Sequence, residues 1–427
     1  MPAFDVIVIG GGIAGLVAAG FAAEGGAGVL LLEASPTLGG RARTRNVSGY
    51  LFNQGAHAFY RDGFLDTALR DLGVAVAGNR PALADGFFVS DDKLHQAPFS
   101  AAGLASTTLL SDAEKREVAS LFRRVIERST ETPRGISLKD ALEALSSSAK
   151  IRSMFAAMTR LTSLVHAPMA ADGRALLDQL HGGLTRNVLY LDGGWGTLID
   201  GLKSACVERG VDLRSGARVM SLEHGPLWRV ALANGTALTA RGVILAVNPP
   251  QAAKLYPLLK SLPGVTDAVP AKVACLDIGL ASLPRSDILF ALGVDRPLYF
   301  SVHSAAARLA PEGAALVHAV RYLEPGEKPD RNRLIAELEE FLDLVQPGWR
   351  DNERARQFLP SMPAISSIPL AATGGANGRP GFAVPNEDGI FIAGDWVGSV
   401  GMLADAAAIG GRSAGEAAAR LVAASRR

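Results

Sequence analysis

The chain has 427 residues, of which 48% are hydrophobic and 20% charged, and its formal net charge at pH 7 is +1. This length allows two or three domains at about 150 residues each, and a chain so close to neutral has no field to attract a polyanion, which argues against a nucleic acid partner. The two cysteines, Cys206 and Cys275, are far apart and form no CxxC pair, which excludes a disulfide framework, a cysteine-ligated metal site and a dithiol redox centre.

The chain opens with a predicted strand, turn, helix and second strand. Residues 6–9 are β-branched and apolar and run directly into glycines, which predicts a strand buried on both faces. Residues 13–23 are mostly small and predict a buried helix that ends at Gly25. Residues 29–32 predict a second buried strand that ends at Glu33. This order is a βαβ unit.

The rest of the chain divides into three stretches of different character. Between residues 76 and 187 we expect a hairpin at 87–92 and helices at 112–128, 137–147, 149–164 and 173–182. From 188 to 250 we expect a strand at 188–191, a helix that ends at Glu208 and strands at 212–214, 217–223, 227–233 and 243–247, with Asn234-Gly235 as a hairpin turn. From 251 onward we expect strands at 272–280, 298–303, 314–322, 354–359 and 390–393, helices at 328–345 and 403–422, and an irregular loop over the Pro- and Gly-rich residues 360–385.

The turn after the first predicted strand carries the spacing GxGxxG, from Gly10 to Gly15. Gly10 permits the sharp turn, Gly12 lets the backbone approach a diphosphate, and Gly15 lets helix and strand pack closely. The free amides at the helix start, at Ile13 and Ala14, then face the phosphates together with the positive end of the helix dipole.

An acidic residue ends the second predicted strand. Glu33 follows Gly15 by eighteen residues, which matches the acidic residue that hydrogen-bonds a ribose in dinucleotide folds. The spacing GxGxxG alone is often an ordinary glycine-rich turn. With the flanking strand, the helix and Glu33 all in place, it predicts a dinucleotide site.

The residues after Glu33 indicate which dinucleotide binds. The run from Ala34 ends in an apolar residue followed by Gly39, Gly40 and Arg41. It resembles the second fingerprint of the superfamily of FAD-dependent amine oxidases, protoporphyrinogen oxidases and phytoene desaturases. The resemblance implies that Ala34 lines the cofactor site, that Gly39 and Gly40 run beside the diphosphate, and that Arg41 faces its charge with a bidentate guanidinium.

Two internal stretches resemble the same superfamily. Residues 52–57 resemble the segment that passes the flavin ring, which implies cofactor contacts for Gly55 and Ala56. Residues 194–198, a helix and residues 216–219 resemble the element that returns to the adenosine end. In that element Val219 would pair with the adenine through its backbone.

The end of the chain resembles the C-terminal flavin motif of the superfamily, over residues 389–395 and 401–404. The resemblance implies that Gly394 and Asp395 bind the ribityl chain or the diphosphate. It also implies that the amides of Met402 and Leu403, at a helix start, face the pyrimidine edge of the flavin and favour its reduced, negatively charged form.

The resemblance also implies the architecture. We expect an α/β fold with a discontinuous Rossmann-like FAD-binding domain, made of a parallel sheet and a small antiparallel sheet, and an inserted α+β substrate domain. Residues 1–75, 188–250 and 376–427 would form the FAD-binding domain, and residues 76–187 and 251–375 the substrate domain. We expect non-covalent FAD, because Cys206 and Cys275 lie in predicted core elements away from Asp395.

The candidate catalytic side chains are few, because a flavin accepts the hydride and the protein supplies orientation and a dry cavity. His57 directly follows the flavin segment. Tyr299, Ser301 and His303 alternate along a predicted strand and would share one face, from which they could orient a substrate or move a proton. The competing interpretation is structural: a core histidine at 57, and a strand face that packs on a helix.

The predicted substrate is apolar. Aromatic residues make up only 6% of the chain, and between Met362 and Ile390 only Phe382 is available for the aromatic pair that flanks the substrate in amine oxidases. An aliphatic cavity, as in the compact desaturase branch of the superfamily, fits better. The expected reaction is desaturation or oxidation of an isoprenoid- or polyene-like molecule by hydride transfer to flavin N5.

Three alternatives stay open. A flavin amine oxidase is disfavoured by the missing aromatic pair. An isomerase or cyclase that uses reduced FAD without net redox change cannot be separated from the desaturase by its sequence. A prenyl-binding escort protein, which keeps the fold without catalysis, is opposed by Arg41 and by the intact motif from Gly10 to Glu33.

The partners follow from what the sequence lacks. No second GxGxxG is present for a nicotinamide coenzyme, so oxygen or a quinone is the expected electron acceptor. We expect a cytoplasmic chain without a transmembrane segment. A lipid-like substrate would add peripheral membrane contact, for which residues 255–262 are the candidate surface.

Overall fold

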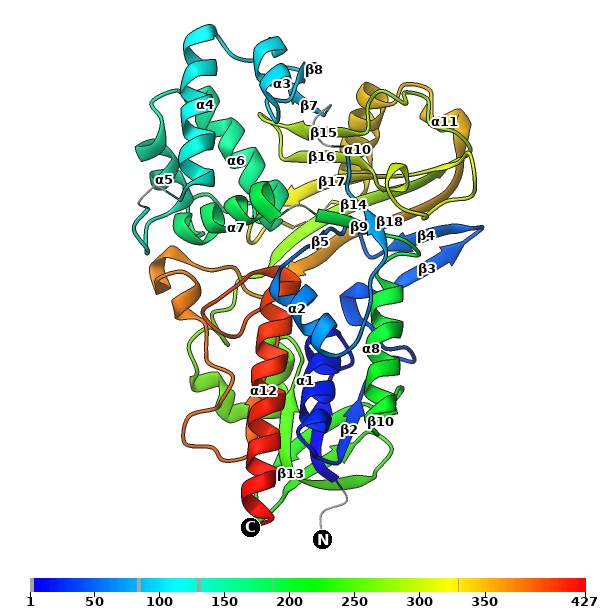
Figure 1. Ribbon diagram of the computed structural model, residues 1–427, viewed down its shortest axis with the longest axis vertical. Coiled ribbons are helices and arrows are strands. Elements are labelled where there is room, and N and C mark those ends of the chain that lie inside the picture. The colour runs from blue at the N-terminus through cyan, green and yellow to red at the C-terminus, as the bar shows by residue number, and fades with distance from the viewer. Residues whose placement is uncertain (1–3, 83–85, 129–131, 187, 329) are drawn as a thin grey trace.

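Two seven-stranded sheets organise the chain in the computed structural model, which describes residues 4–82, 86–128, 132–186, 188–328 and 330–427. Figure 1 shows the first sheet with its helices in the lower half of the molecule and the second sheet with its helices in the upper half. The expected domain ranges also include residues 1–3, 83–85, 129–131, 187 and 329, and the predicted helix 328–345 includes residue 329; these residues lie outside the described ones.

The first sheet is parallel at its centre and antiparallel at one side. Its strands run in the order β10 (Asp212–Arg214), β2 (Val29–Leu32), β1 (Phe4–Ile9), β13 (Ala237–Leu245), β12 (Trp228–Leu232) and β11 (Val219–Glu223), with β19 (Ile390–Ile392) also paired to β13. The pairs among β10, β2, β1, β13 and β19 are parallel. The antiparallel pair of β12 and β13 is joined at Asn234-Gly235, as predicted.

The parallel strands form because their residues are aliphatic and buried on both faces. Ile7, Val8, Leu30 and Leu31 are all fully buried. Their register pairs Ile9 with Leu32, so the two strands end side by side. The loops that follow these strands therefore start at the same edge of the sheet.

One face of the first sheet is covered by α1 (Ile13–Glu24), α8 (Gly196–Glu208) and α12 (Leu403–Ser425), which Figure 1 shows side by side. Two glycines of α12 let it touch α1: a Cβ on Gly411 would overlap the carbonyl of Ala14, and one on Gly415 the carbonyl of Ala18. The C-terminal helix is thereby fixed against the helix that follows the glycine turn. Two further helices lie in this half, α2 (Phe64–Asp71) and α9 (Pro249–Leu255).

The second sheet runs in the order β18 (Glu353–Ile365), β14 (Ala271–Leu280), β17 (Ala315–Leu323), β16 (Leu298–Val302), β15 (Phe290–Gly293), β7 (Phe87–Ser90) and β8 (Lys93–Gln96). Only β15 and β7 pair in parallel. Side chains alternate along β14. Val273 and Cys275 pack with the helices that precede β9 (Val188–Leu191), whereas Ala274 and Leu276 pack with α10 (Arg331–Val345). Both faces of this sheet are therefore covered.

The helices of this half are α3 (Ala101–Ser106), α4 (Asp112–Ile126), α5 (Leu138–Leu145), α6 (Ala149–Ser163) and α7 (Gly173–Arg186) on one side, and α10 (Arg331–Val345) and α11 (Trp349–Asn352) on the other. Side-chain caps explain several starts: Ser111 and Glu114 form a capping box on α4, and Ser137 caps α5. Within the described residues, no helix combines the length and the apolar character that crossing a bilayer requires.

Several short elements were not predicted. They are the hairpin β3 (Thr44–Val47) and β4 (Tyr50–Asn53), the strand β15, and the two-residue strands β5 (Phe59–Tyr60) and β6 (Gly78–Asn79), which both pair with β9 (Val188–Leu191). Short 3-10 turns lie at Gly40–Ala42, Pro257–Ser261, His303–Ala305, Ala371–Thr373 and Ala376–Gly378.

The predicted boundaries that differ most from the structure are those of two strands. The loop expected over 360–385 begins instead as part of β18, which continues to Ile365 through Pro360 and Pro363. Both prolines are tolerated because β18 is an edge strand of the second sheet. The strand expected at 243–247 is the end of β13, which starts at Ala237 and ends at Leu245.

Candidate cofactor and substrate site

A cavity of about 770 Å³ lies between the two sheets. Ile9 and Leu32, the last residues of β1 and β2, line it, as do Ala246 and Ala393, which follow β13 and β19. The cavity therefore lies at the carboxyl edge of the parallel strands, where α/β folds bind their ligands. From the second sheet, β14 and β18 contribute Lys272 and Met362 to the opposite wall.

The glycine turn forms the floor of the cavity as predicted from its spacing. Gly10 has a φ of 111°, and a Cβ there would overlap the carbonyl oxygen of Ala246. Gly12 has open space around its Cβ position and lines the cavity. Gly15 does not line the cavity; a Cβ there would overlap the carbonyl oxygen of Gly10, so it allows close helix packing.

The start of α1 is open to an anion. Its N-cap residue, Gly12, has no side-chain cap, and the first turn holds no acidic residue. Ile13 and Ala14, at that start, line the cavity. The N-terminal amides of a helix have no partner within the helix, and together with the dipole they favour a phosphate.

Glu33 ties the turn to the adjacent strand. Its carboxylate accepts hydrogen bonds from the backbone N–H groups of Gly11 and Ser35, both at 2.7 Å. Glu33, Ala34 and Val219 line the same end of the cavity. A carboxylate oxygen accepts more than one hydrogen bond, so Glu33 can still take a ribose hydroxyl there.

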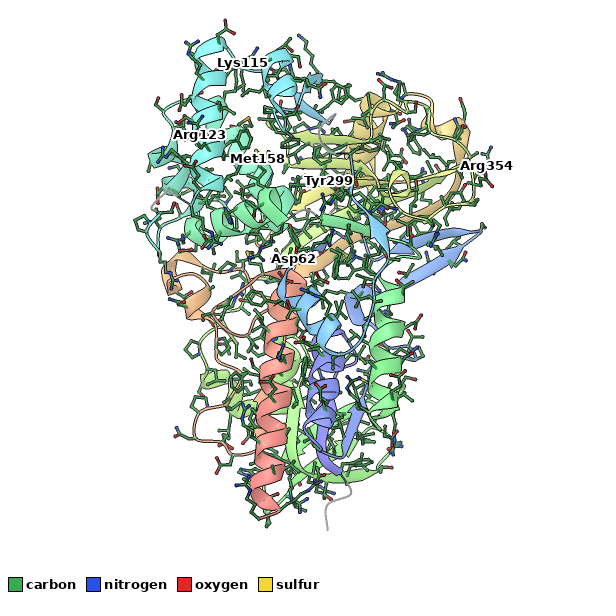
Figure 2. All side chains as sticks on the ribbon, viewed as in Figure 1. Asp62, Lys115, Arg123, Met158, Tyr299 and Arg354 are labelled. Atoms are coloured by element: carbon green, nitrogen blue, oxygen red, sulfur yellow. The ribbon has the colours of Figure 1, made fainter. Side chains whose placement is uncertain are left out.

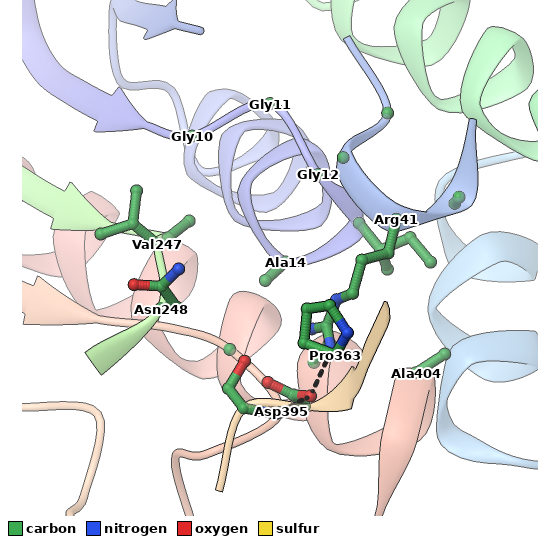
Figure 3. A pocket seen from close by; sticks show the side chains of 18 of the residues that line it. Gly10, Gly11, Gly12, Ala14, Arg41, Val247, Asn248, Pro363, Asp395 and Ala404 are labelled. Atoms are coloured by element: carbon green, nitrogen blue, oxygen red, sulfur yellow. Dashed lines mark hydrogen bonds and ion pairs between the residues drawn. The ribbon is translucent and has the colours of Figure 1, made fainter. Parts of the chain in front are cut away.

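An ion pair spans the middle of the cavity (Figure 3). The Arg41 guanidinium is 2.8 Å from Asp395 Oδ2, which also accepts the backbone N–H of Ser366 at 3.0 Å. Burial alone would raise the pKa of Asp395, but Arg41 and Ser366 outweigh it and hold that pKa below its usual value. Asp395 Oδ1 is buried without a partner among the described residues.

These features fit the polar half of FAD. Gly39 and Gly40 line the cavity with φ values of 117° and 54°, and a Cβ on Gly40 would lie 3.4 Å from the Cα of Gly12. Two glycine-rich segments thus lie against each other beside Arg41, so that both backbones can approach a diphosphate in the cavity. The unpartnered oxygen of Asp395 is an acceptor for a hydroxyl such as those of a ribityl chain.

The segment expected beside the flavin divides into residues that line the cavity and residues that support it. Ala56 and His57 line it, whereas Gly55 packs behind, where a Cβ would lie 2.9 Å from Cys275 Sγ. At the start of α12, Leu403 lines the cavity and Met402 is buried in the core next to it. Gly394 lines the cavity as well.

His57 is the one predicted catalytic candidate that the structure places on the cavity wall. Its Nδ1 lies 2.9 Å from the carbonyl oxygen of Gly55, and its ring centroid lies 4.8 Å from that of Trp195. Burial lowers the pKa of His57, although the Gly55 carbonyl opposes this. The imidazole is therefore neutral at neutral pH and can accept a proton.

Tyr299 and His303 lie elsewhere. Figure 2 places Tyr299 within the second sheet, and neither residue lines the cavity. The hydroxyl of Tyr299 is 3.4 Å from that of Tyr190, and the His303 ring stacks on Tyr190 at 3.7 Å. β16 ends at Val302 and His303 starts a 3-10 turn, yet Tyr299 and His303 both contact Tyr190, so the face that they share packs on Tyr190 and not on the cavity.

Several polar residues of the cavity wall were missed from sequence, among them Lys272, Asp405 and Tyr60. Lys272, at the start of β14, lines the cavity, and its side chain has no hydrogen-bond or ion-pair partner among the described residues. Asp405 accepts the Leu65 N–H at 2.9 Å and so holds the start of α2. Tyr60 donates to the carbonyl of Thr162, and burial raises its pKa to about 12. No local spacing marks any of these residues as a ligand.

The apolar part of the wall around His57 is aliphatic except for Trp195. Its aliphatic members are Ala56, Ala58, Leu65, Leu164, Ala268, Pro270, Met362, Leu403 and Ala404. Leu164 and Leu403 have positive φ values, 60° and 54°. A bulky residue rarely adopts this conformation, and such strain gathers at functional sites.

The sequence matches the family model described as flavin containing amine oxidoreductase over residues 13–272. A stretch of 51 residues, 12% of this chain and 10% of the relative, is 53% identical to a carotenoid 3,4-desaturase of Haloarcula japonica, so the match spans only a small part of that protein.

Two solved structures are similar over nearly their whole lengths. An oxidoreductase from Methanosarcina mazei is 18% identical with a TM-score of 0.75, over 96% of this chain and 99% of that one. A cyclohexylamine oxidase from Brevibacterium oxydans is 16% identical with a TM-score of 0.69, over 100% of both chains. At these identities the likeness shows a shared fold.

Proposed function

The chain belongs to the flavin containing amine oxidoreductase family and is an FAD-dependent oxidoreductase, and from this premise we propose that it desaturates or oxidises an apolar, isoprenoid- or polyene-like small molecule. When bound, FAD supplies the two-electron acceptor, which takes a hydride at N5. The observation that carries the proposal is the aliphatic wall around His57. The stretch shared with a carotenoid desaturase supports the same substrate class.

The residues of the chain take distinct parts in this proposal. Glu33 and Val219 hold the adenosine end, and the glycine turn with Arg41 holds the diphosphate. Loss of two hydrogens from adjacent carbons sends one away as a hydride and the other as a proton. His57, neutral and facing the cavity, accepts that proton.

FAD is proposed to be bound without a covalent link. Burial raises the pKa of the Cys206 thiol to about 12 and that of Cys275 well above its usual value. Both residues are buried, so neither offers a thiolate to the flavin. Precipitation of the protein in acid should release all flavin to the supernatant.

We also propose that the two sheets belong to domains with different roles, one for FAD and one for the substrate. Residues 1–75, 188–250 and 376–427 would bind FAD, and residues 76–187 and 251–375 would bind the substrate. The strands of the first sheet all come from the former ranges, and those of the second sheet all come from the latter.

The test of the proposed function is anaerobic. The FAD-loaded enzyme is mixed with acyclic isoprenoids and polyenes in detergent, with porphyrinogens and with primary amines, and the visible flavin band is followed. Bleaching by a polyene or isoprenoid supports the proposal, with oxygen or a quinone then restoring the colour. Bleaching by amines alone overturns it and assigns an amine oxidase.

An amine oxidase is the second candidate, because Asp405 places a carboxylate on the cavity wall. Burial raises the pKa of Asp405, although the backbone amides of Leu65 and Phe64 oppose this. If amines bleach the flavin, Asp405→Asn should weaken their binding and leave that of a neutral analogue unchanged.

Leu164→Gly tests the apolar wall directly. Glycine relieves the positive φ, a gain of roughly 1–2 kcal/mol, which offsets much of the roughly 1–2 kcal/mol lost with a half-buried leucine. We therefore expect a melting temperature within a few degrees of the parent and a KM for the apolar substrate raised several-fold. Arg128→Gly relieves a similar φ of 52° on a residue that does not line the cavity and should leave KM unchanged.

Membrane contact is proposed for residues 255–262. Leu255 lines the cavity, and Leu258, three residues on in a 3-10 turn, is 57% exposed. This segment therefore connects the cavity to the surface. We expect the protein to float with neutral phosphatidylcholine vesicles in a density gradient and Leu258→Glu to reduce the floated fraction severalfold. Equal flotation of both proteins would contradict membrane contact at this segment.

A further inference from the structure

A row of polar residues crosses the second sheet beneath the cavity wall. Asp277 of β14 lies opposite His318 of β17 and Gln357 of β18 in the strand register. His318 Nδ1 is 2.7 Å from Asp277 Oδ1, and Gln357 Nε2 donates to Asp277 Oδ2 at 2.9 Å. Asp277 and His318 are both 0% exposed.

The face of β14 that carries Asp277 is turned toward residues 50–57. Side chains two apart in a strand share a face. Position 275 contacts this segment, because a Cβ on Gly55 would lie 2.9 Å from Cys275 Sγ, and position 279 does so too, because a Cβ on Gly279 would lie 2.6 Å from Tyr50. Asp277 lies between them.

A chain of hydrogen bonds connects the row to the cavity. Gln357 Nε2 also donates to the carbonyl oxygen of Asn53 at 2.7 Å. The side-chain oxygen of Asn53 accepts the backbone N–H of Trp195 at 2.9 Å. Trp195 and His57 are the two cavity-wall residues whose rings contact each other. The row is therefore bonded to Asn53, at the start of the His57 segment, and through Asn53 it is connected to Trp195.

The row is costly to the fold. His318 Nε2 and its neighbour His303 Nε2 are buried without partners among the described residues, and their ring centroids are 4.3 Å apart. A buried polar atom left unpaired destabilises the fold, and a buried charged pair is often replaced by apolar residues without loss of stability. Stability alone therefore does not account for these residues.

We propose that Gln357, Asp277 and His318 form a positioning row that orients residues 53–57 and places the Asp277 carboxyl and the His318 imidazole behind His57. The inference rests on the proposed function, in which His57 accepts a substrate proton. The three residues do not line the cavity. They act through His57 and are positioning residues.

Asp277 and His318 act on the pKa of His57 in opposite directions. Burial lowers the pKa of His57 most, the carbonyl of Gly55 raises it, His318 and Arg41 lower it, and the Asp277 carboxylate raises it. Burial lowers the pKa of His303 far below its usual value, so that His303 stays neutral. Removing the negative charge of Asp277 should make His57 harder to protonate, and removing His318 should make it easier.

The experiment follows His57 by NMR in the FAD-loaded enzyme with ¹³Cε1-labelled histidine. The chain has seven histidines, and the absence of one resonance from His57→Gln identifies His57. We expect the titration midpoint of His57 to move to lower pH in Asp277→Asn and to higher pH in His318→Gln. His224→Gln, on the β11–β12 hairpin, is the matched control and should leave the titration midpoint of His57 unchanged.

A third variant tests orientation without changing any charge. Gln357→Met breaks the bond to Asn53, and we expect the His57 resonance to lose the ring-current shift that Trp195 imposes, while that of the surface residue His95 stays in place. Thermal melts of all variants show that they fold.

Midpoints that move in the same direction, or that do not move, overturn the proposed influence of Asp277 and His318 on His57. An unchanged His57 resonance in Gln357→Met overturns the orienting role. None of these readouts uses a substrate. Failure of the apolar substrates to bleach the flavin would overturn the proposed function and leave the NMR result standing.

Discussion

Gly12→Ala is expected to abolish FAD binding while the protein still folds. Gly12 has a φ of −82°, which alanine adopts freely, and no atom lies within 4 Å of the Cβ position. The new methyl would instead project into the channel that the diphosphate must enter. We expect an unchanged melting temperature without FAD and a loss of affinity of about 100-fold or more, which corresponds to roughly 2.7 kcal/mol.

Gly182→Ala is the matched control for this variant. Gly182 lies within α7, its Cβ position is also open, and it does not line the cavity. Titration of both apoproteins with FAD, followed by flavin fluorescence, compares them directly. Retention of FAD by Gly12→Ala would show that the diphosphate does not pass the glycine turn.

Arg41→Ala is expected to weaken FAD binding and to destabilise the apoprotein in a pH-dependent way. Hydrogen bonds to charged groups contribute roughly 1.5–3 kcal/mol, so the affinity should fall about 10- to 100-fold. The side chain of Asp395 is 2% exposed and would lose its counter-ion. We expect a loss of roughly 1–3 kcal/mol in unfolding free energy at pH 7, below the range for a fully buried pair because 39% of the Arg41 side chain is accessible.

The sign of the pH dependence follows from Asp395. Its pKa in the folded protein is below the unfolded value of about 3.9. The stabilisation of the fold by the Arg41–Asp395 ion pair is therefore present above about pH 4. It is lost as the pH falls through the lower pKa that Asp395 has in the folded protein. The difference between parent and Arg41→Ala should be largest near neutral pH and should vanish in acid.

Urea denaturation at several pH values measures this difference. Arg70→Ala, which removes an exposed arginine near Asp62 and Asp66, should lower the free energy of unfolding by less than about 1 kcal/mol at every pH. A pH-independent loss in Arg41→Ala would mean that Arg41 stabilises the fold by packing rather than by its charge.

The cofactor half of the site could be predicted because its signals are local. From Gly10 to Arg41, each role depends on a backbone conformation or a residue type at a short spacing, and the strand register then brings the turn and Glu33 together. The motif at the end of the chain was also recognisable, since Asp395 lies three residues after the end of a buried strand.

The substrate side was not predictable in the same way. Tyr299 and His303 were chosen because they alternate in sequence, but the strand ends between them and both side chains are buried away from the cavity. Lys272 and Asp405 line the cavity only because their elements meet there. The positive φ of Leu164 arises from the backbone conformation of the folded chain, and a leucine in the sequence does not indicate it.

The amino-acid sequence by itself determined the cofactor, because a glycine turn, a helix start and an acidic strand end need only neighbours along the chain. Tertiary structure decided which distant residues contact one another. Arg41 pairs with Asp395, 354 residues away, and Asp277 forms hydrogen bonds with Gln357 and His318 on the two neighbouring strands. Such pairs depend on sheet register and on the packing of distant elements, which no local pattern of residues encodes.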